Sequence, residues 1–199
     1  EIDGPAGSES EQATVNYKGT GGVTLDSGLK KLLFALKFRE KNILLSSSLT
    51  PESKLMFIRE PATRIAKVAP YLRLDSDPYP AVVDGRLTWI VDGYTTSKGY
   101  PYSQSEQLGD VVRDSRGQVL PDGVVNYIRN SVKATVDAYD GKVKLYTWDE
   151  ADPVLKTWKK VFPGTVLPKS DISDSLKKHL RYPEDFFKVQ RQLLSRYHV

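Results

Sequence analysis

The sequence predicts an α+β fold: a mainly antiparallel sheet with two Asp-Gly hairpins, covered by four to six helices. In the middle of the chain, short apolar runs flank Asp84-Gly85 and again Asp140-Gly141, a pattern typical of β-hairpins. Before and after this region, apolar residues recur at spacings of three and four, which indicates amphipathic helices. The 199 residues, of which 39% are hydrophobic, suffice to bury a core without metals or disulfides.

We expect residues 1–16 to be a flexible acidic N-terminal segment, because they are small, polar and acidic. We expect residues 17–199 to form a single α+β domain that is a fragment of a longer soluble region. The last helix suggests the longer region, because its apolar face continues almost to the end of the sequence. Part of that face should therefore be exposed. It comprises Phe186, Val189, Leu193 and Tyr197.

Helices are expected on the N-terminal side of the sheet. Asp26 or Ser27 caps the first of them, whose apolar stripe is Leu29, Leu32, Leu33 and Leu36. Thr50-Pro51 offers a further helix start, with proline at the first helical position. Pro61 opens a short helix that ends before Pro70.

The two hairpins are expected at residues 81–91 and 135–146, where Asp-Gly supplies the positive φ angles of a tight primed turn. Their similarity fits either an internal repeat or chance. The polar stretch between them, residues 95–123, is long enough to be functional or disordered. After the sheet, Asp152-Pro153 and Pro183-Glu184-Asp185 each open a helix.

The net charge of +4 is unevenly distributed, because acidic residues dominate the first 26 positions. A mildly basic body favours anionic partners such as lipid headgroups or anionic envelope polymers. The basic residues are scattered, so a solvated surface is the competing interpretation and nucleic acid is not an expected partner. The absence of cysteine excludes disulfides and thiol nucleophiles. No apolar run is long enough to span a bilayer.

Motifs for catalysis and cofactor binding are absent from the sequence. There is no Gly-x-Ser-x-Gly elbow, and His179 and His198 lie in helical, partly apolar surroundings. Two histidines without cysteine give no zinc-ligand spacing. The glycine-rich stretch at residues 19–22 lacks the third glycine of a dinucleotide fingerprint. We therefore expect no cofactor and no metal, and we assign no catalytic residue.

Aspartates are the strongest candidates for chemistry. Asp75 and Asp77 follow a predicted strand, and alternate residues of an extended chain point the same way, so they could meet at Ca²⁺ or Mg²⁺. Prolines follow at once, so a rigid turn with the carboxylates bonded to local amides is the alternative. Asp92 and Asp137 lie on the two hairpins. The paired carboxyl groups of glycosidases stand roughly 5–10 Å apart, so this interpretation depends on the distance between the two aspartates in the fold.

Aromatic residues gather near these aspartates. If exposed, they could stack on sugars or headgroups, and if buried they are core and loop anchors. We expect a binding site where the Asp75–Pro80 turn, the Asp92–Tyr94 strand end and the Tyr100–Ser103 loop meet. The competing interpretation is that the prolines only shape turns. The candidate binding residues are Asp75, Asp77, Asp92, Tyr94, Tyr100 and Tyr102.

Several longer stretches resemble the signature sequences of uncharacterised protein family 0182. They are residues 75–80, 89–96, 100–103, 126–133, 136–141 and 179–185, and the resemblance runs in order from about Tyr17 to Val199. That family comprises large bacterial membrane proteins with several N-terminal spans and a long soluble region. The resemblance implies that this chain is a piece of that region, on the extracytoplasmic side of the cell membrane. It implies no activity, substrate or catalytic residue.

Two hypotheses of function follow. The first is a non-enzymatic extracytoplasmic domain of a bacterial integral membrane protein. It would bind a ligand or a partner, including the rest of its own membrane-spanning chain. The alternative is an envelope-directed hydrolase that uses aspartate carboxylates. The two differ in whether Asp75, Asp77, Asp92 and Asp137 converge in one pocket or are bonded separately to turns and backbone amides.

Overall fold

The computed structural model describes residues 2–5, 12–14, 17–46, 49–112 and 123–197. The chain divides into two units, Glu1–Phe57 and Ile58–Val199. Much of the predicted acidic segment over 1–16 lies outside the described residues. The expectation of one domain over residues 17–199 stays a prediction.

The first unit is built from short strands and two helices. Strand β1 (Ile2–Pro5) pairs antiparallel with β2 (Gln12–Thr14). Strand β3 (Val23–Thr24) pairs antiparallel with β4 (Lys54–Leu55). Helices α1 (Gly28–Phe38) and α2 (Asn42–Leu45) follow one another between β3 and β4 in the chain.

Helix α1 begins where the sequence predicts, with Ser27 as its N-cap. Its hydroxyl accepts a hydrogen bond of 3.3 Å from the Lys30 N–H. The apolar stripe of this helix is exposed, with Leu29 at 66% and Leu36 at 67%. The helix expected at Thr50-Pro51 is wrong. The Thr50 carbonyl accepts from the Ser53 N–H at 3.0 Å and closes a turn that leads into β4.

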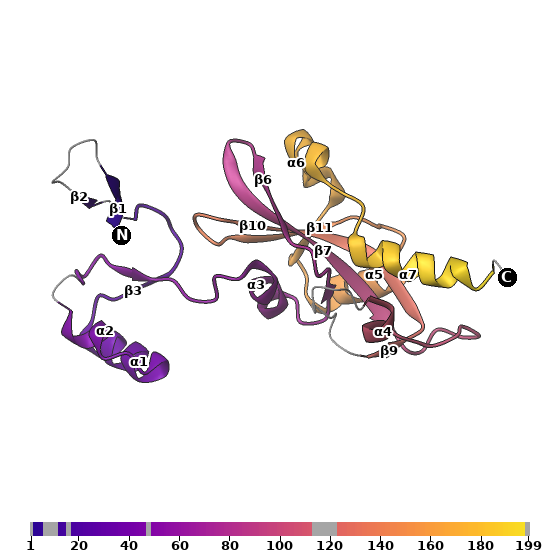
Figure 1. The fold of residues 1–199 in the computed structure, drawn as a ribbon, viewed down its shortest axis with the longest axis horizontal. Helices are drawn as coiled ribbons and strands as arrows, with labels where there is room; N and C mark the ends of the chain where they lie inside the picture. Colours follow the sequence, from indigo (N-terminus) through magenta and orange to yellow (C-terminus); the bar gives the residue numbers. More distant parts are fainter. Residues whose placement is uncertain (1, 6–11, 15–16, 47–48, 113–122, 198–199) are drawn as a thin grey trace. The chain divides into compact units, whose positions relative to one another are not determined.

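A mainly antiparallel sheet dominates the second unit, as predicted (Figure 1). Its central strands β7 (Arg86–Ser97) and β10 (Tyr127–Asp137) are long and pair with each other. The order is β12-β11-β10-β7-β5, and β6 also pairs with β7. Only β11 and β12, among the described strands of this sheet, run parallel. The shorter strands are β5 (Arg73–Leu74), β6 (Tyr79–Val83), β11 (Val143–Thr147) and β12 (Val166–Leu167).

The two Asp-Gly pairs form different turns. Val83 pairs with Arg86, so Asp84 and Gly85 alone connect β6 to β7, and both have positive φ angles. In the second connection Val136 pairs with Val143, and the Gly141 N–H donates to the Asp137 carbonyl at 2.8 Å. That longer turn has a positive φ at Gly141 but not at Asp140. The expectation of two identical tight turns is therefore wrong for the second pair.

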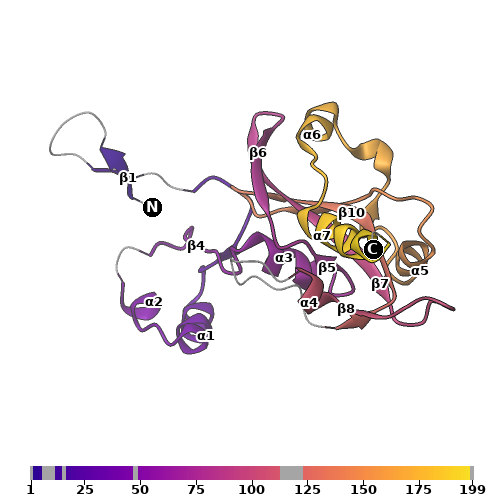
Figure 2. The ribbon, with the colours of Figure 1, turned by 45° about the vertical axis from the view of Figure 1, so that its right-hand side comes forward.

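Alternate residues of the central strands face two hydrophobic clusters. On one face, Val91 and Ala134 pack with Ile65 of α3 (Pro61–Val68) and Leu155 of α5 (Pro153–Val161). On the other face, Ile90 packs in a cluster with Leu176 of α6 (Asp174–His179), which lies beside β6 (Figure 2). Residues of η1 (Lys169–Asp171) precede α6. Because helices cover both faces of the sheet, several polar side chains of β7 and β10 are buried as well; they include Asp92, Thr95, Ser131 and Lys133.

The described residues hold seven α-helices, more than the four to six predicted. The helices not predicted individually are α2, α4 (Leu108–Val112) and α6, which are too short for an apolar period to reveal. Helix α4 and strand β8 (Glu106–Gln107) lie in the stretch predicted as a loop over 95–123, of which residues 113–122 are outside the described part, and strand β9 (Val124–Val125) follows it directly. Helices α3 and α5 begin at the predicted prolines.

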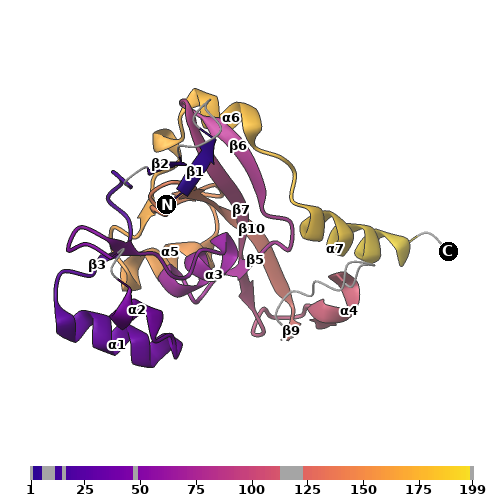
Figure 3. The same ribbon diagram turned by 60° about the vertical axis from the view of Figure 1, so that its left-hand side comes forward.

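The last helix, α7 (Glu184–Ser195), begins after Pro183 as predicted and runs beside α4 (Figure 3). Val189 is buried between these helices in a small cluster with Leu108. Further along, Leu193 is 41% and Tyr197 85% exposed. The expected exposure of this apolar face is confirmed. No helix within the described ranges is long and apolar enough to cross a membrane.

Candidate functional site

The predicted binding residues separate into two places. Asp75, Asp92 and Tyr94 come together beneath the start of α7 and are buried. Tyr100 and Tyr102 line a groove elsewhere in the second unit. Asp77 is half-buried, and its side chain has no hydrogen-bond partner among the described residues. The proposed meeting of three stretches is therefore realised for two of them.

Asp75 holds together the turn, the sheet and the last helix. One carboxylate oxygen accepts from the Asp77 N–H at 2.9 Å, which is the turn alternative of the sequence analysis. The other accepts from the Asp185 N–H at 3.1 Å, so it bonds an amide that the start of α7 leaves unpaired. The Tyr94 hydroxyl donates to the same oxygen. Burial and this carboxylate raise the pKa of Tyr94.

Asp185, at the start of α7, forms hydrogen bonds with Ser76 in the turn after β5. It accepts from the Ser76 N–H at 2.7 Å and from the Ser76 hydroxyl at 3.0 Å. Burial and the nearby Asp75 carboxylate raise the pKa of Asp185, against the hydrogen bonds from Ser76. From the sequence, Asp185 is predicted only as part of a helix start. Its pairing with a turn more than one hundred residues away leaves no local signal in the sequence.

Asp92 pairs with a lysine inside the sheet. Lys133 stands opposite Asp92 across the β7–β10 ladder, and its ammonium donates to the carboxylate. The Asn130 amide donates to the same oxygen at 2.9 Å. The two charged side chains are only 2% and 3% exposed. Burial raises the pKa of Asp92, and the Lys133 charge opposes that rise. This arrangement neutralises Asp92 rather than presenting it to solvent.

Asp137 is also engaged locally. It forms a two-point ion pair with Arg86, with N–O distances of 2.6 and 3.1 Å. It also accepts from the backbone N–H groups of Tyr139 and Asp140 in the longer hairpin turn. The Arg86 guanidinium lowers the pKa of Asp137. No three His, Cys, Asp or Glu side chains in the described ranges gather in a way that could hold a metal ion.

Asp152 is a polar centre that the sequence analysis recognised only as a helix start. It is fully buried and caps α5 through the Val154 and Leu155 N–H groups. Hydroxyl groups from β7 and β10 also donate to it at 2.6–2.7 Å; they belong to Thr95, Ser131 and Tyr127. Burial acts to raise the pKa of Asp152, but these hydrogen bonds outweigh it and lower the pKa.

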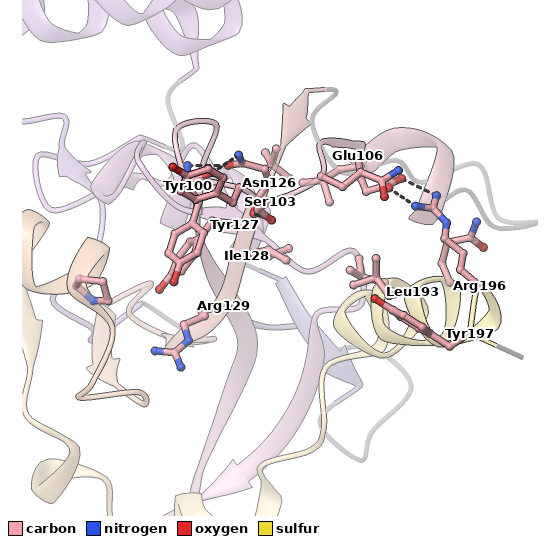
Figure 4. Close-up of a pocket in the computed structure, with 17 residues that line it drawn as sticks. Tyr100, Ser103, Glu106, Asn126, Tyr127, Ile128, Arg129, Leu193, Arg196 and Tyr197 are labelled. Carbon is pink, nitrogen blue, oxygen red and sulfur yellow. Dashed lines mark hydrogen bonds and ion pairs between the residues drawn. The ribbon is translucent and has the colours of Figure 1, made fainter.

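The tyrosine groove is a cavity of about 920 Å³ between the Tyr100–Glu106 stretch, the start of β10 and α7 (Figure 4). Tyr100 stacks on Tyr127 with ring centres 5.4 Å apart on one side. Leu193 and Tyr197 of the last helix segment line the other side. Glu106 and Arg196 bridge the groove by an ion pair, with one N–O distance of 2.9 Å. The residues that line it include Tyr100, Tyr102, Glu106, Tyr127, Ile128, Arg129, Leu193, Arg196 and Tyr197.

The loop that carries Tyr100 is fixed to the sheet. The Tyr100 N–H donates to the Asn126 side chain at 3.0 Å, and the Asn126 amide donates back to the Tyr100 carbonyl at 2.8 Å. The Ser103 hydroxyl donates to the Asn126 carbonyl at 3.0 Å. Tyr102 projects from this loop fully exposed. The groove therefore has a wall whose backbone is held in place, with aromatic surface open to a partner.

These features describe an α+β fold in which Asp75, Asp92 and Asp137 are bonded within the protein and the tyrosine groove presents aromatic side chains. The sequence model of the uncharacterised protein family UPF0182 matches residues 1–199. The chain belongs to this family, as the resemblance in the sequence analysis predicted.

Several relatives that carry the family name share more than half of their aligned residues with this chain. A UPF0182 protein of Frankia alni is 59% identical over the whole chain, and one of Kineococcus radiotolerans is 58% identical over the whole chain. A UPF0182 protein of Mycobacteroides abscessus is 57% identical over 96% of the chain. In each case the match covers 20% of the relative, so the chain spans about a fifth of their length. No solved structure matches the chain.

Proposed function

We propose that this chain is a non-catalytic binding domain and that its tyrosine groove binds another segment of the full-length protein. The observation that carries the proposal is the exposed aromatic and apolar lining of the groove beside a loop held by hydrogen bonds. Tyrosine is enriched in protein interfaces, where it supplies contact area and a hydrogen-bonding group. The hydrolase alternative is less well supported, because Asp75, Asp92 and Asp137 are each occupied by donors of the protein itself.

The occupant we propose is part of the same protein. The relatives are about five times as long as this chain, so a large additional sequence is tethered to the domain. A tethered segment reaches the groove at a high effective concentration and needs only modest intrinsic affinity. From the family resemblance, we further propose that the domain belongs to a bacterial integral membrane protein and lies on the extracytoplasmic side of the cell membrane.

Photo-crosslinking in a full-length relative tests the groove. Benzoylphenylalanine is placed at the position of Tyr197 or Tyr102, and the matched control is Tyr139, an exposed tyrosine in the hairpin turn. We expect the two groove positions to crosslink to a peptide from outside the region equivalent to this chain, and the control not to do so. Crosslinks that are absent from the groove positions, or equally frequent from Tyr139, would overturn the proposal.

Cysteine labelling in intact cells tests the location. The chain has no cysteine of its own, so a single cysteine at the exposed Tyr139 position reports on this region in a full-length relative freed of other cysteines. We expect a membrane-impermeant maleimide to label it in intact cells. Labelling only after the cells are permeabilised would place the domain on the cytoplasmic side and contradict the proposal.

A further inference from the structure

A second cavity of about 610 Å³, the basic cavity, is lined by more positive than negative side chains. Its charged residues are Arg129, Lys133, Lys177, Arg181 and Asp149. They come from β10, from α6, from the segment after α6 and from the segment after β11. Folding therefore brings four cations and one carboxylate together from separate parts of the second unit.

Arg181 is held in place by an aromatic ring and has no carboxylate partner among the described residues. Its guanidinium carbon lies 4.3 Å from the centre of the Tyr79 ring. That ring is itself fixed, because the Tyr79 hydroxyl donates to the His179 carbonyl at 3.2 Å and accepts from the Arg181 N–H at 3.1 Å. No carboxylate of the described chain pairs with Arg181. A stacked guanidinium keeps its N–H fork in one plane, ready for oxyanion acceptors.

The other three cations of the cavity each have a carboxylate partner, and they differ in how available they remain to a ligand. Lys133 is buried at the cavity wall and has two acceptors, Asp92 and the Arg181 carbonyl at 3.1 Å, for its three N–H donors. Lys177 pairs at 2.9 Å with Asp174, whose side chain is 90% exposed. Such a surface pair contributes little and exchanges readily. Arg129 is paired with Asp149 at 3.2 Å and is the least available.

We propose that the basic cavity binds a phosphate group, held by Arg181 and Lys177 with Lys133 behind them. A concave surface with excess positive charge concentrates anions. A phosphate group offers more acceptor oxygens than a single carboxylate does, and its tetrahedral arrangement lets it accept from donors on several elements. The phosphate can belong to a lipid headgroup or to a soluble molecule. This inference stands on residues outside the tyrosine groove, apart from Arg129, so it does not depend on the proposed function.

The test measures binding to the chain at constant ionic strength, with inorganic phosphate as one probe. Vesicles of phosphatidylglycerol in phosphatidylcholine are the other probe, and pure phosphatidylcholine vesicles are their control. The cavity variant is K177Q/R181Q. The matched variant K142Q/K144Q removes the same charge from exposed lysines outside the cavity. The four substituted side chains are all exposed, so each variant should fold and keep the circular dichroism spectrum of the wild type.

We expect K177Q/R181Q to weaken binding by about tenfold or more, as loss of charge-assisted hydrogen bonds implies. We expect K142Q/K144Q to change it less than about twofold. Phosphate binding with this pattern supports a soluble ligand, and vesicle binding alone with this pattern supports a lipid headgroup. Absence of binding to both probes, or equal weakening by the two variants, would overturn the proposal.

Discussion

The Lys133–Asp92 pair shows how a single side chain can constrain the interior of the sheet. Both charges are removed from water between β7 and β10. Burying one charge without its partner is costly, whereas the complete pair with its extra hydrogen bonds is tolerated. The Asn130 amide and the Arg181 carbonyl provide those extra bonds. We therefore regard Asp92 as a structural residue that also fixes Lys133 at the wall of the basic cavity.

Replacing Lys133 by methionine should lower the free energy of unfolding by about 3–5 kcal/mol, because Asp92 would remain buried without its cation. The matched control is K144M, at an exposed position of the neighbouring strand, with an expected change within about 0.5 kcal/mol. Urea denaturation followed by circular dichroism measures both. A K133M protein as stable as K144M would show that the buried pair does not constrain the fold as described.

Asp185 should give the protein a measurable pH dependence. Its raised pKa means that the folded state keeps the proton at pH values where the unfolded chain has lost it. Its contribution to stability is therefore fully present below the ordinary carboxyl pKa of about 4 and is lost as the pH rises through the folded-state pKa. The stability of D185N relative to wild type should accordingly increase between about pH 3 and pH 7.

The comparison for Asp185 is Asp174, whose pKa is lowered by its hydrogen bond with Lys177. Its contribution is present above the ordinary pKa and lost as the pH falls through the lowered value. D174N should thus change in the opposite direction across the same range. Denaturation curves for both variants at a series of pH values measure the two slopes. A D185N curve parallel to wild type at every pH would contradict the assignment.

At the scale of elements, Asp152 links helix α5 to the two central strands. A helix cap alone contributes about 1 kcal/mol, but this carboxylate also receives three hydroxyl groups in a buried setting. D152A should therefore destabilise by more than a simple cap does, by about 2–4 kcal/mol. The control is S173A, which removes the α6 cap hydrogen bond of 3.2 Å and a hydrogen bond of 2.9 Å to Asp84 at a more exposed site. Chemical denaturation measures both variants. An equal loss in the free energy of unfolding would show that Asp152 contributes no more than a helix cap.

The tight turn between β6 and β7 makes a second prediction at this scale. Gly85 has a φ of +78° with open space where a Cβ would lie, so alanine meets backbone strain but no steric clash. G85A should therefore destabilise by about 1 kcal/mol. G99A is the control, because Gly99 lies in a loop without a positive φ and also has room for a methyl group. Thermal melting measures both variants. A G85A protein with the same melting temperature as G99A would exclude strain at this turn.

At the scale of the whole molecule, the core of the second unit is self-contained. Its three hydrophobic clusters draw their buried residues from positions 65–189. A fragment of residues 58–199 should therefore fold alone and melt cooperatively.

A shorter fragment of residues 73–199 serves as the comparison, because it lacks α3 with Ile65 and also lacks Ala69 and Leu72. It should melt at a lower temperature or not fold, because it exposes the sheet face that α3 covers. Calorimetry distinguishes these outcomes, and a non-cooperative 58–199 fragment would contradict the first expectation.

Much of the architecture could be predicted because its signals are local. Prolines and capping residues mark the starts of α3, α5 and α7, and Asp84-Gly85 marks a turn whose φ angles glycine tolerates. The candidate site was predicted less well. Asp75, Asp92 and Tyr94 do come together, but they are buried in the structure rather than lining a pocket with Tyr100 and Tyr102.

The sequence by itself determined the α+β class, the family and most of the helix starts, because these depend on residues that are neighbours in the chain. Only the tertiary structure decided which groups the charged side chains contact. Asp75 with Asp185, Asp92 with Lys133, and Arg181 with the Tyr79 ring are pairs formed between distant segments. Their partners are set by strand register and by the docking of α7, and a carboxylate or guanidinium looks the same in the sequence whether it is buried, paired or open to a ligand.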